Sequence, residues 1–145
     1  MVEPDDGPET ILCDTTFVSA VQVDGIPQEW PDDVRARLDA SVLAISVVTL
    51  AELRAGHIYG KWGAPRRERA ERLIGSYLLV PLDMPTVNEW ARLAAACKSS
   101  GVTVPHNDLW IASTANVREW PLVSCDKHFD AIPDVEHIRL DPPKR

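Results

Sequence analysis

The amino-acid sequence predicts one α/β domain, in which a parallel β-sheet of about five strands lies between helices. Short apolar runs alternate with longer helical segments along the chain, the order that produces parallel sheets. The runs are continuously apolar, which is typical of strands covered on both faces. The chain has 145 residues, 45% of them hydrophobic and 26% charged. It is therefore long enough to bury a core without disulfides or a structural metal, and it fits a single domain.

Each predicted strand is a short apolar run that stops at a polar or turn-forming residue. Residues 11–13 stop at Asp14, and residues 121–124 lead to Asp126. The fifth run has the weakest apolar pattern. The strands expected on this basis cover residues 11–13, 42–45, 78–82, 121–124 and 137–140.

The predicted helices are bounded by capping and helix-breaking residues. Residues 24–27 break the first helix, and Pro31 and Pro85 suit the first turns of later ones. Ser46 is placed to cap the third helix, and Gly101 closes the fifth. The helices expected on this basis cover residues 15–23, 31–40, 47–59, 65–77, 85–101 and 107–118.

Two of these helices have a predictable face. The arginines of the helix at 65–77 should lie on its exposed side. In the long helix that begins at Pro85, apolar side chains recur at helical spacing and should form its buried stripe. This expected stripe consists of Val87, Trp90, Ala91, Ala94 and Ala95.

Charge is unevenly distributed along the chain. The net charge is −7, which argues against non-specific nucleic-acid binding over the whole surface. Residues 1–40 carry ten acids against two arginines, whereas residues 54–72 carry six cations against two acids. We expect a flexible acidic tail at residues 1–9 and a single domain over residues 10–141. The basic stretch is the one segment whose charge suits a polyanion.

Two further features suggest where the protein works. No apolar run approaches the roughly 18 residues of a membrane span. The N-terminal segment is acidic and polar, unlike a signal peptide. We therefore expect a cytoplasmic protein without a membrane partner.

Four acids are expected at one edge of the sheet. Asp14 and Asp126 follow the first and fourth predicted strands, Glu52 lies in the second turn of the helix after the second strand, and Asp108 lies in the first turn of the helix before the fourth. In open parallel sheets this carboxyl edge is where ligands bind. The four side chains should therefore converge.

Each acid also has an ordinary structural explanation. Asp14 could cap the helix after it, Asp108 could be a first-turn acid favoured by the helix dipole, and Asp126 could be a loop residue. Glu52 is harder to explain, because its helix is apolar around it. Four converging carboxylates repel one another unless a cation lies between them. Oxygen-only ligands favour Mg²⁺ or Mn²⁺ over Zn²⁺.

Four segments resemble the motifs of PIN domains in both order and spacing. They comprise residues 11–16, 46–53, 107–115 and 122–126, and the resemblance covers about residues 10–140. Within that family the chain looks most like VapC, the toxin of a bacterial toxin–antitoxin pair. The resemblance implies a central parallel sheet between helices and a metal-dependent ribonuclease site.

The resemblance also assigns roles to the acids. It implies Asp14, Glu52, Asp108 and Asp126 as catalytic residues. Asp14, Asp108 and Asp126 would hold Mg²⁺, with Mn²⁺ as a possible substitute, and Glu52 would position the attacking water. Hydroxyl positions that bond around the acids match Ser124 and either Thr15 or Thr16. His128 stands where the family often has another acid, so a second metal is not implied.

Substrate and partners follow from the same resemblance. VapC-like toxins cut transfer or ribosomal RNA loops, are inhibited by a VapB-like antitoxin that covers the active site, and usually form homodimers. Metal-assisted hydrolysis predicts 5′-phosphate and 3′-hydroxyl ends. Basic side chains of residues 54–67 either grip RNA or form an ordinary solvated helix face; they are Arg54, Lys61, Arg66 and Arg67.

Two alternative functions remain open at this stage. A catalytically silent PIN-like module would bind RNA or assemble with a partner. An aspartyl-phosphate phosphatase would need a second acid two residues after its nucleophile, but Thr16 occupies that position. Neither the histidines nor the tryptophans show a ligand pattern, although Trp62 beside Lys61 is a candidate for base stacking.

The cysteines are expected to be reduced thiols. The chain has three of them, an odd number, in a spacing that matches no zinc motif. Cys13 and Cys125 each precede a proposed site aspartate, so the alternation of side chains along a strand should turn them away from the acids. The family's strand order would place these two thiols near each other.

Overall fold

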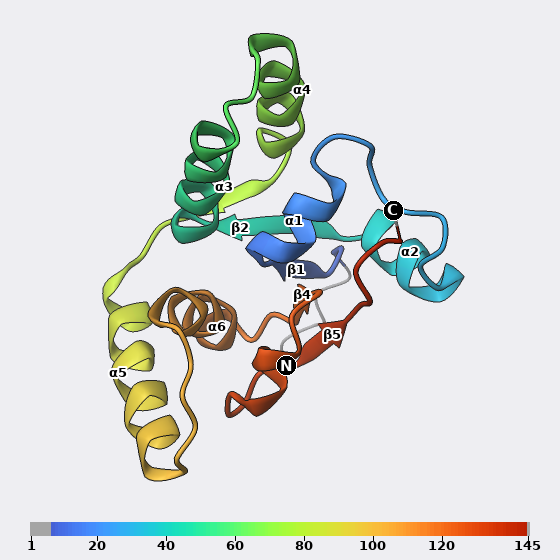
Figure 1. Ribbon diagram of the computed structural model, residues 1–145. Helices are drawn as coiled ribbons and strands as arrows, with labels where there is room; N and C mark the ends of the chain where they lie inside the picture. Colours follow the sequence, from blue (N-terminus) through green and yellow to red (C-terminus); the bar gives the residue numbers. More distant parts are fainter. Residues whose placement is uncertain (1–6, 145) are drawn as a thin grey trace.

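The computed structural model describes residues 7–144 and contains a five-stranded sheet whose strand pairs are all parallel (Figure 1). The strand order is β3-β2-β1-β4-β5. This confirms the predicted α/β fold. The strands are β1 (Thr10–Cys13), β2 (Val42–Ser46), β3 (Leu78–Val80), β4 (Leu122–Ser124) and β5 (His137–Arg139).

Within residues 7–144, six α-helices connect or cover these strands, and a short 3₁₀-helix that was not predicted from the sequence precedes β5. Side chains cap three of the helices: Asp14 caps α1, Ser46 caps α3, and Asp83 caps α5. The helices are α1 (Thr15–Val21), α2 (Asp32–Asp39), α3 (Val47–Tyr59), α4 (Ala64–Ile74), α5 (Met84–Ser99), α6 (His106–Arg118) and the 3₁₀-helix η1 (Lys127–Ala131).

The sheet separates two hydrophobic clusters. Ile11 and Cys13 of β1 pack in one cluster with residues of α1, α2 and α4, while Leu12 packs in the other with residues of α5 and α6. This alternation follows from the two-residue period of a strand. Successive residues of β1 therefore enter opposite layers, and Asp14 follows at the point where the strand ends.

The edge strand β3 departs from the expectation that the strands are buried on both faces. Leu78 and Leu79 are about half exposed, and Leu82 beyond the strand is also exposed. The strand order places β3 outermost, next to β2 alone. Its apolar side chains therefore remain accessible on the surface.

The predicted buried stripe of α5 was wrong in three of its five positions. Val87, Ala91 and Ala95 are exposed, and the buried residues of the helix are Thr86, Leu93 and Cys97. Alanine carries little information about burial, and Thr86 can be buried because its hydroxyl donates to the Asp83 carboxylate over 2.5 Å. Trp90 and Ala94 do pack against the core, as expected.

Other sequence predictions concern the chain ends and the basic helix. The proposed tail falls largely on residues 1–6, which lie outside the described residues. Glu9, at the end of the proposed tail, is fixed by two contacts. Arg37 donates to the Glu9 carboxylate, and the Glu9 carbonyl accepts from the Val42 amide. The arginines of α4 are exposed, as predicted. None of the helices within residues 7–144 has the length and apolarity that crossing a membrane requires.

Candidate active site

The topological switch point of the sheet lies between β1 and β4. From β1 the chain continues to β2 and β3 on one side, and β4 and β5 are then added on the other side. Ligands of open parallel sheets bind at such a point, beyond the carboxyl ends of the strands. Asp14 follows β1 directly, and its amide donates to the Val123 carbonyl of β4 over 3.1 Å. The fold therefore places Asp14 at the expected ligand site.

Asp14 is almost completely buried, with only 2% of its surface exposed. Its carboxylate accepts from the Phe17 amide at 2.8 Å, the Thr16 hydroxyl at 2.8 Å and the Ser124 hydroxyl at 2.9 Å. Burial raises the pKa of Asp14, and these hydrogen bonds act in the opposite direction. The Thr16 backbone amide also bonds to this carboxylate. Asp14 is thus a helix cap whose carboxylate is held at the carboxyl edge of the sheet.

Two hydroxyls tie Asp14 to the end of β4. The fully buried Ser124 donates to Asp14 and accepts from the Asp126 amide over 2.8 Å. Thr16 also donates to Asp14, and it accepts from the Cys125 amide over 3.0 Å. These hydroxyls fix the position of Asp126 relative to Asp14.

Glu52 is tied to the same region through α1. Thr15 donates to the Glu52 carboxylate over 2.6 Å, and the Asn107 amide group lies 3.5 Å from its other oxygen. Since Asn107 begins the turn of α6 that carries Asp108, Glu52 bridges α1 and α6. The sequence left open whether Thr15 or Thr16 bonds to the acids. Both do, but to different acids.

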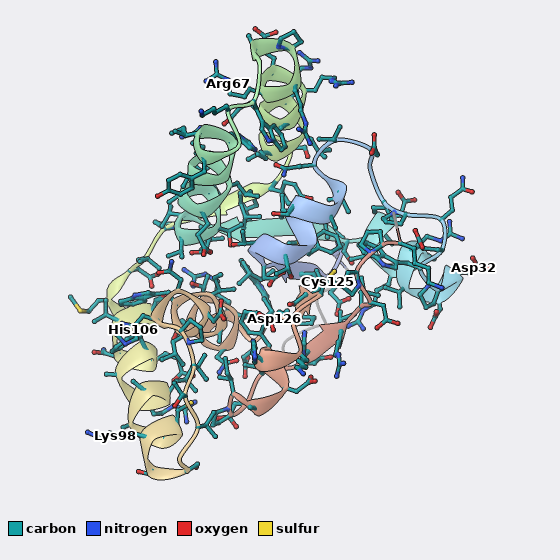
Figure 2. All side chains as sticks on the ribbon, in the orientation of Figure 1. Asp32, Arg67, Lys98, His106, Cys125 and Asp126 are labelled. Atoms are coloured by element: carbon teal, nitrogen blue, oxygen red, sulfur yellow. The ribbon has the colours of Figure 1, made fainter. Side chains whose placement is uncertain are left out.

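Asp108 is the acid on which the charges of the other three act. Its pKa is raised to about 6, first by burial and then by the charges of Asp126, Glu52 and Asp14, while His128 acts in the opposite direction. The predicted acids, which come from four separate segments, are thus near enough for three of them to act on the fourth. In Figure 2, Asp126 lies near the centre of the molecule, close to α6.

His128 is an additional member of this cluster that sequence reasoning did not assign. Both its backbone amide and its Nδ1 lie 2.8 Å from Asp126 Oδ1. Asp126 caps η1 through the first of these contacts. The imidazole is largely exposed. The signal that could have found it is the Asp-x-His spacing, which suits an aspartate at a helix N-cap.

The donor set fits a hydrated divalent cation better than an enclosed one. Within residues 7–144, no three acidic, histidine or cysteine side chains are already close enough together to surround an ion. Mg²⁺ is usually held by one or two carboxylates and keeps several waters. The neighbouring acids contribute to the raised pKa of Asp108, and a bound cation would relieve this repulsion.

The cysteines lie apart from this chemistry. All three thiols are free. Cys13 is fully buried in the cluster on the α1 side of the sheet, and Cys125 packs against the same cluster. Burial is the main cause that raises the pKa of Cys125 to about 11, and burial also raises the pKa of Cys13 well above its ordinary value. As expected, both thiols are reduced, and they are neutral packing groups in the cluster on the α1 side of the sheet.

Comparison with known proteins identifies the family. The PIN domain model matches residues 11–135. The chain belongs to the PIN domain family. The resemblance inferred from the four acidic segments is therefore confirmed.

The relatives of this PIN domain include two VapC proteins of Mycobacterium tuberculosis. Ribonuclease VapC4 is 35% identical over 98 residues, which span 66% of this chain and 75% of the relative. Ribonuclease VapC5 is 37% identical over 103 residues, which span 68% and 76%. A solved member of the VapBC family of toxin–antitoxin systems, VapBC-5 of the same organism, superimposes with a TM-score of 0.68 at 29% identity, covering 92% of this chain and 100% of that one. The chain is thus a VapC-type PIN domain.

Proposed function

We propose that this protein is a metal-dependent endoribonuclease that acts as the toxin of a toxin–antitoxin pair. The observation that carries the proposal is geometric: Asp14 lies at the switch point beyond β1, and Ser124 links its carboxylate to the Asp126 amide. The charges of Asp126, Glu52 and Asp14 also contribute to the raised pKa of Asp108, which supports a shared site. The names of the two VapC relatives support ribonuclease activity. The acids would be the catalytic set.

The metal would be Mg²⁺, with Mn²⁺ as a substitute, held by Asp14, Asp108 and Asp126. When bound, such an ion makes a coordinated water more acidic and stabilises negative charge on a phosphate oxygen. Asp108 must be deprotonated to bind it, and a cation favours that form. Ser124 and Thr16 hold Asp14 in place for this role.

Glu52 would orient the attacking water, since Thr15 holds its carboxylate at the same edge. The water oxygen forms a new bond to phosphorus, the bond from phosphorus to the 3′ oxygen breaks, and that oxygen takes up a proton. The products are a 5′-phosphate and a 3′-hydroxyl. The ribose 2′-hydroxyl takes no part as a nucleophile. RNA loops of the transfer or ribosomal kind are the proposed substrates.

Two other functions fit the structure less well. A nucleophilic aspartate would have to reach a phosphorylated substrate, but Asp14 is 2% exposed and is surrounded by three donors. A catalytically silent module would not need four mutually repelling carboxylates. These charges are costly without a cation, so a scaffold role alone does not explain them.

The proposed inhibitor is a VapB-like antitoxin. The neighbour VapBC-5 is a toxin–antitoxin system. An arginine of the antitoxin would pair with the clustered carboxylates. An apolar hollow of about 380 Å³, lined by Phe17, Val21, Leu43 and Tyr77 among others, lies on the flank of α1 and would hold apolar side chains of the same segment.

A homodimer is the proposed assembly. Large apolar side chains are exposed along one continuous stretch, from the edge strand β3 into the first turn of α5. A second copy would cover them, since exposed apolar patches mark interaction sites. The stretch comprises Leu78, Leu79, Leu82, Met84 and Val87.

The proposed activity is tested with purified protein and transfer RNA, in Mg²⁺ and in excess chelator. Cleavage should require the metal, and the downstream fragments should carry 5′-phosphates that a phosphate-dependent exonuclease recognises. Asp14→Asn should abolish cleavage, while the exposed control Asp24→Asn should not. Cleavage that persists in chelator, or in the Asp14 variant, would refute the proposal. The antitoxin is tested separately, by co-purification with the neighbouring gene product and recovery of cleavage after its proteolysis.

A further inference from the structure

A strongly basic surface lies on the hairpin formed by α3 and α4, and we call residues 54–72 the basic arm. Six cations and two acids give the arm a net charge of +4 in a chain whose net charge is −7. Figure 1 shows α3 and α4 rising together above the sheet. Figure 2 places Arg67 at the outer end of this pair, far from Lys98 on α5.

Two of the six cations are already used within the arm. Arg54 of α3 pairs with Glu71 of α4, with its Nε 3.1 Å from the carboxylate. The Arg66 guanidinium lies 3.7 Å from the centre of the Trp62 ring. The other four are exposed, and none has an ion pair within residues 7–144. These available cations are Lys61, Arg67, Arg69 and Arg72.

The turn that carries these cations is fixed by packing. The Trp62 ring stacks on His57 at 4.4 Å between centres, and His57 donates to the buried Gln22 side chain over 2.8 Å. A Cβ at Gly60 would come within 2.8 Å of the Trp62 ring, so only glycine permits this approach. Lys61 follows with a φ of 52°, the left-handed conformation. The arm is thus a defined structure, and Trp62 serves it as a packing group.

An exposed aromatic side chain lies beside the cations. Tyr59, the last residue of α3, is 84% exposed. Proteins that bind single-stranded nucleic acid combine cations along the backbone with aromatic rings on which bases stack. An acidic peptide would use the cations but would have no need of the ring. The combination therefore favours a nucleic acid.

The arm is connected to the acidic site by α3 itself. Glu52 lies in the second turn of this helix, Tyr59 ends it seven residues later, and Lys61 follows two residues beyond. At 1.5 Å per residue Glu52 and Tyr59 lie about 10 Å apart along the axis. This corresponds to about three stacked nucleotides at about 3.4 Å each.

We propose that the basic arm binds the phosphate backbone of the RNA substrate a few nucleotides from the cleaved bond, with Tyr59 stacking on a base. This inference rests on the proposed ribonuclease function. Lys61, Arg67, Arg69 and Arg72 supply the charge, and the rigid turn sets the spacing between the bound phosphates and the site. The arm thereby supplies affinity that the acidic edge cannot, because the acids repel phosphate.

The test uses the cleavage-deficient variant Asp108→Asn, so that intact RNA can be followed by fluorescence anisotropy with a labelled transfer RNA. Arg67→Gln/Arg69→Gln is added to this background. The matched control is Lys98→Gln/Lys144→Gln, which removes two exposed cations elsewhere. Affinity is measured at several salt concentrations between about 50 and 200 mM.

The arm variant should bind RNA roughly tenfold more weakly. Its plot of log affinity against log salt should also be less steep by about 1.4, because each of the two lost single-strand phosphate contacts contributes about 0.7. The control should change neither quantity. Tyr59→Ser should weaken binding without changing the salt slope, because stacking releases no counterions.

The outcomes separate this proposal from the one on which it rests. If the Asp108→Asn parent binds no RNA at low salt, the proposed function fails. If the parent binds RNA and the arm variant matches it, or if arm and control variants lose affinity equally, the arm does not bind RNA. Loss of antitoxin binding with unchanged RNA binding would likewise overturn the proposal in favour of a protein partner.

Discussion

The acidic edge of the sheet and the basic arm both gather charge of one sign, but they do so in opposite ways. The acids are drawn together at the switch point, where Asp14 is almost completely buried and held by three donors. The arginines of α4 are spread along an exposed helix. The charges of the other three acids act on the partly buried Asp108, whereas solvent separates the cations. A single change should therefore matter greatly at the edge and little on the arm.

The largest expected effect tests this difference on cleavage. Asp108→Asn should lower the initial rate of RNA cleavage at least about a thousandfold, which corresponds to about 4 kcal/mol of transition-state stabilisation. Arg67→Gln alone should lower it by less than about threefold, because one exposed cation of several is removed. If the two variants lost similar amounts of cleavage activity, a single change would not matter more at the acidic edge than on the basic arm.

The pH dependence of stability gives the next largest effect. The pKa of Asp108 is about 6 in the folded protein, whereas its ordinary value is 3.8. Asp108 therefore stays protonated to a higher pH in the folded state than in the unfolded state. The stability from this group is complete below pH 4 and is lost as pH rises through 6. In chelator, the free energy of unfolding of Asp108→Asn relative to the unchanged protein should therefore rise by about 2–3 kcal/mol from pH 4 to pH 7.

This pH measurement has an internal control. Asp24→Asn removes an exposed acid just beyond the C-terminal end of α1, so it controls for the loss of one carboxylate outside the acidic edge. A flat difference for Asp108→Asn would mean that the acids do not interact as described.

Two buried serines, one at the acidic edge and one outside it, allow the same comparison to be made inside the protein. Ser124→Ala should lower the free energy of unfolding by about 2 kcal/mol, since Asp14 loses a donor and the Asp126 amide loses an acceptor. Ser113 is an equally buried serine, but its hydroxyl donates only to the Leu109 carbonyl of its own helix. Ser113→Ala should therefore cost less than about 1 kcal/mol. Equal costs in chemical denaturation would show that Ser124 does not organise the site.

The thiols provide the smallest effect. Cys13→Ala/Cys125→Ala should cost about 1–2 kcal/mol in stability, because one buried and one partly buried group are removed from the core. The Mn²⁺ affinity of this double variant should be unchanged, because both thiols are uncharged packing groups. A metal affinity that falls with the thiols would mean that the acids are held differently.

The sequence predicted the order of strands and helices because each is a short apolar run or a capped periodic segment. It also located Asp14, Glu52, Asp108 and Asp126, since strand ends and helix starts determine which edge a residue occupies. It could not show that Thr15 bonds to Glu52 while Thr16 bonds to Asp14, because that depends on side-chain direction. The exposure of Leu78 follows from the strand order, which no local pattern encodes.

The residues that contact the acids could not be predicted from the sequence either. Asn107 approaches Glu52 from a segment 55 residues away. The α5 stripe was misplaced because Ala91 and Ala95 carry little hydrophobic signal. Local patterns thus identified the acidic edge, while the contacts that hold it are tertiary.

The clustered acids are proposed to form one divalent-cation site, and calorimetric titration of Mn²⁺ into the purified protein near pH 7 tests this most directly. The unchanged protein and Asp24→Asn should bind the ion with the same affinity. Asp108→Asn and Asp14→Asn should each bind it at least about tenfold more weakly, because Mn²⁺ prefers charged oxygen ligands. Unchanged Mn²⁺ affinity in both site variants, or no Mn²⁺ binding by the unchanged protein, would show that the clustered acids do not form one divalent-cation site.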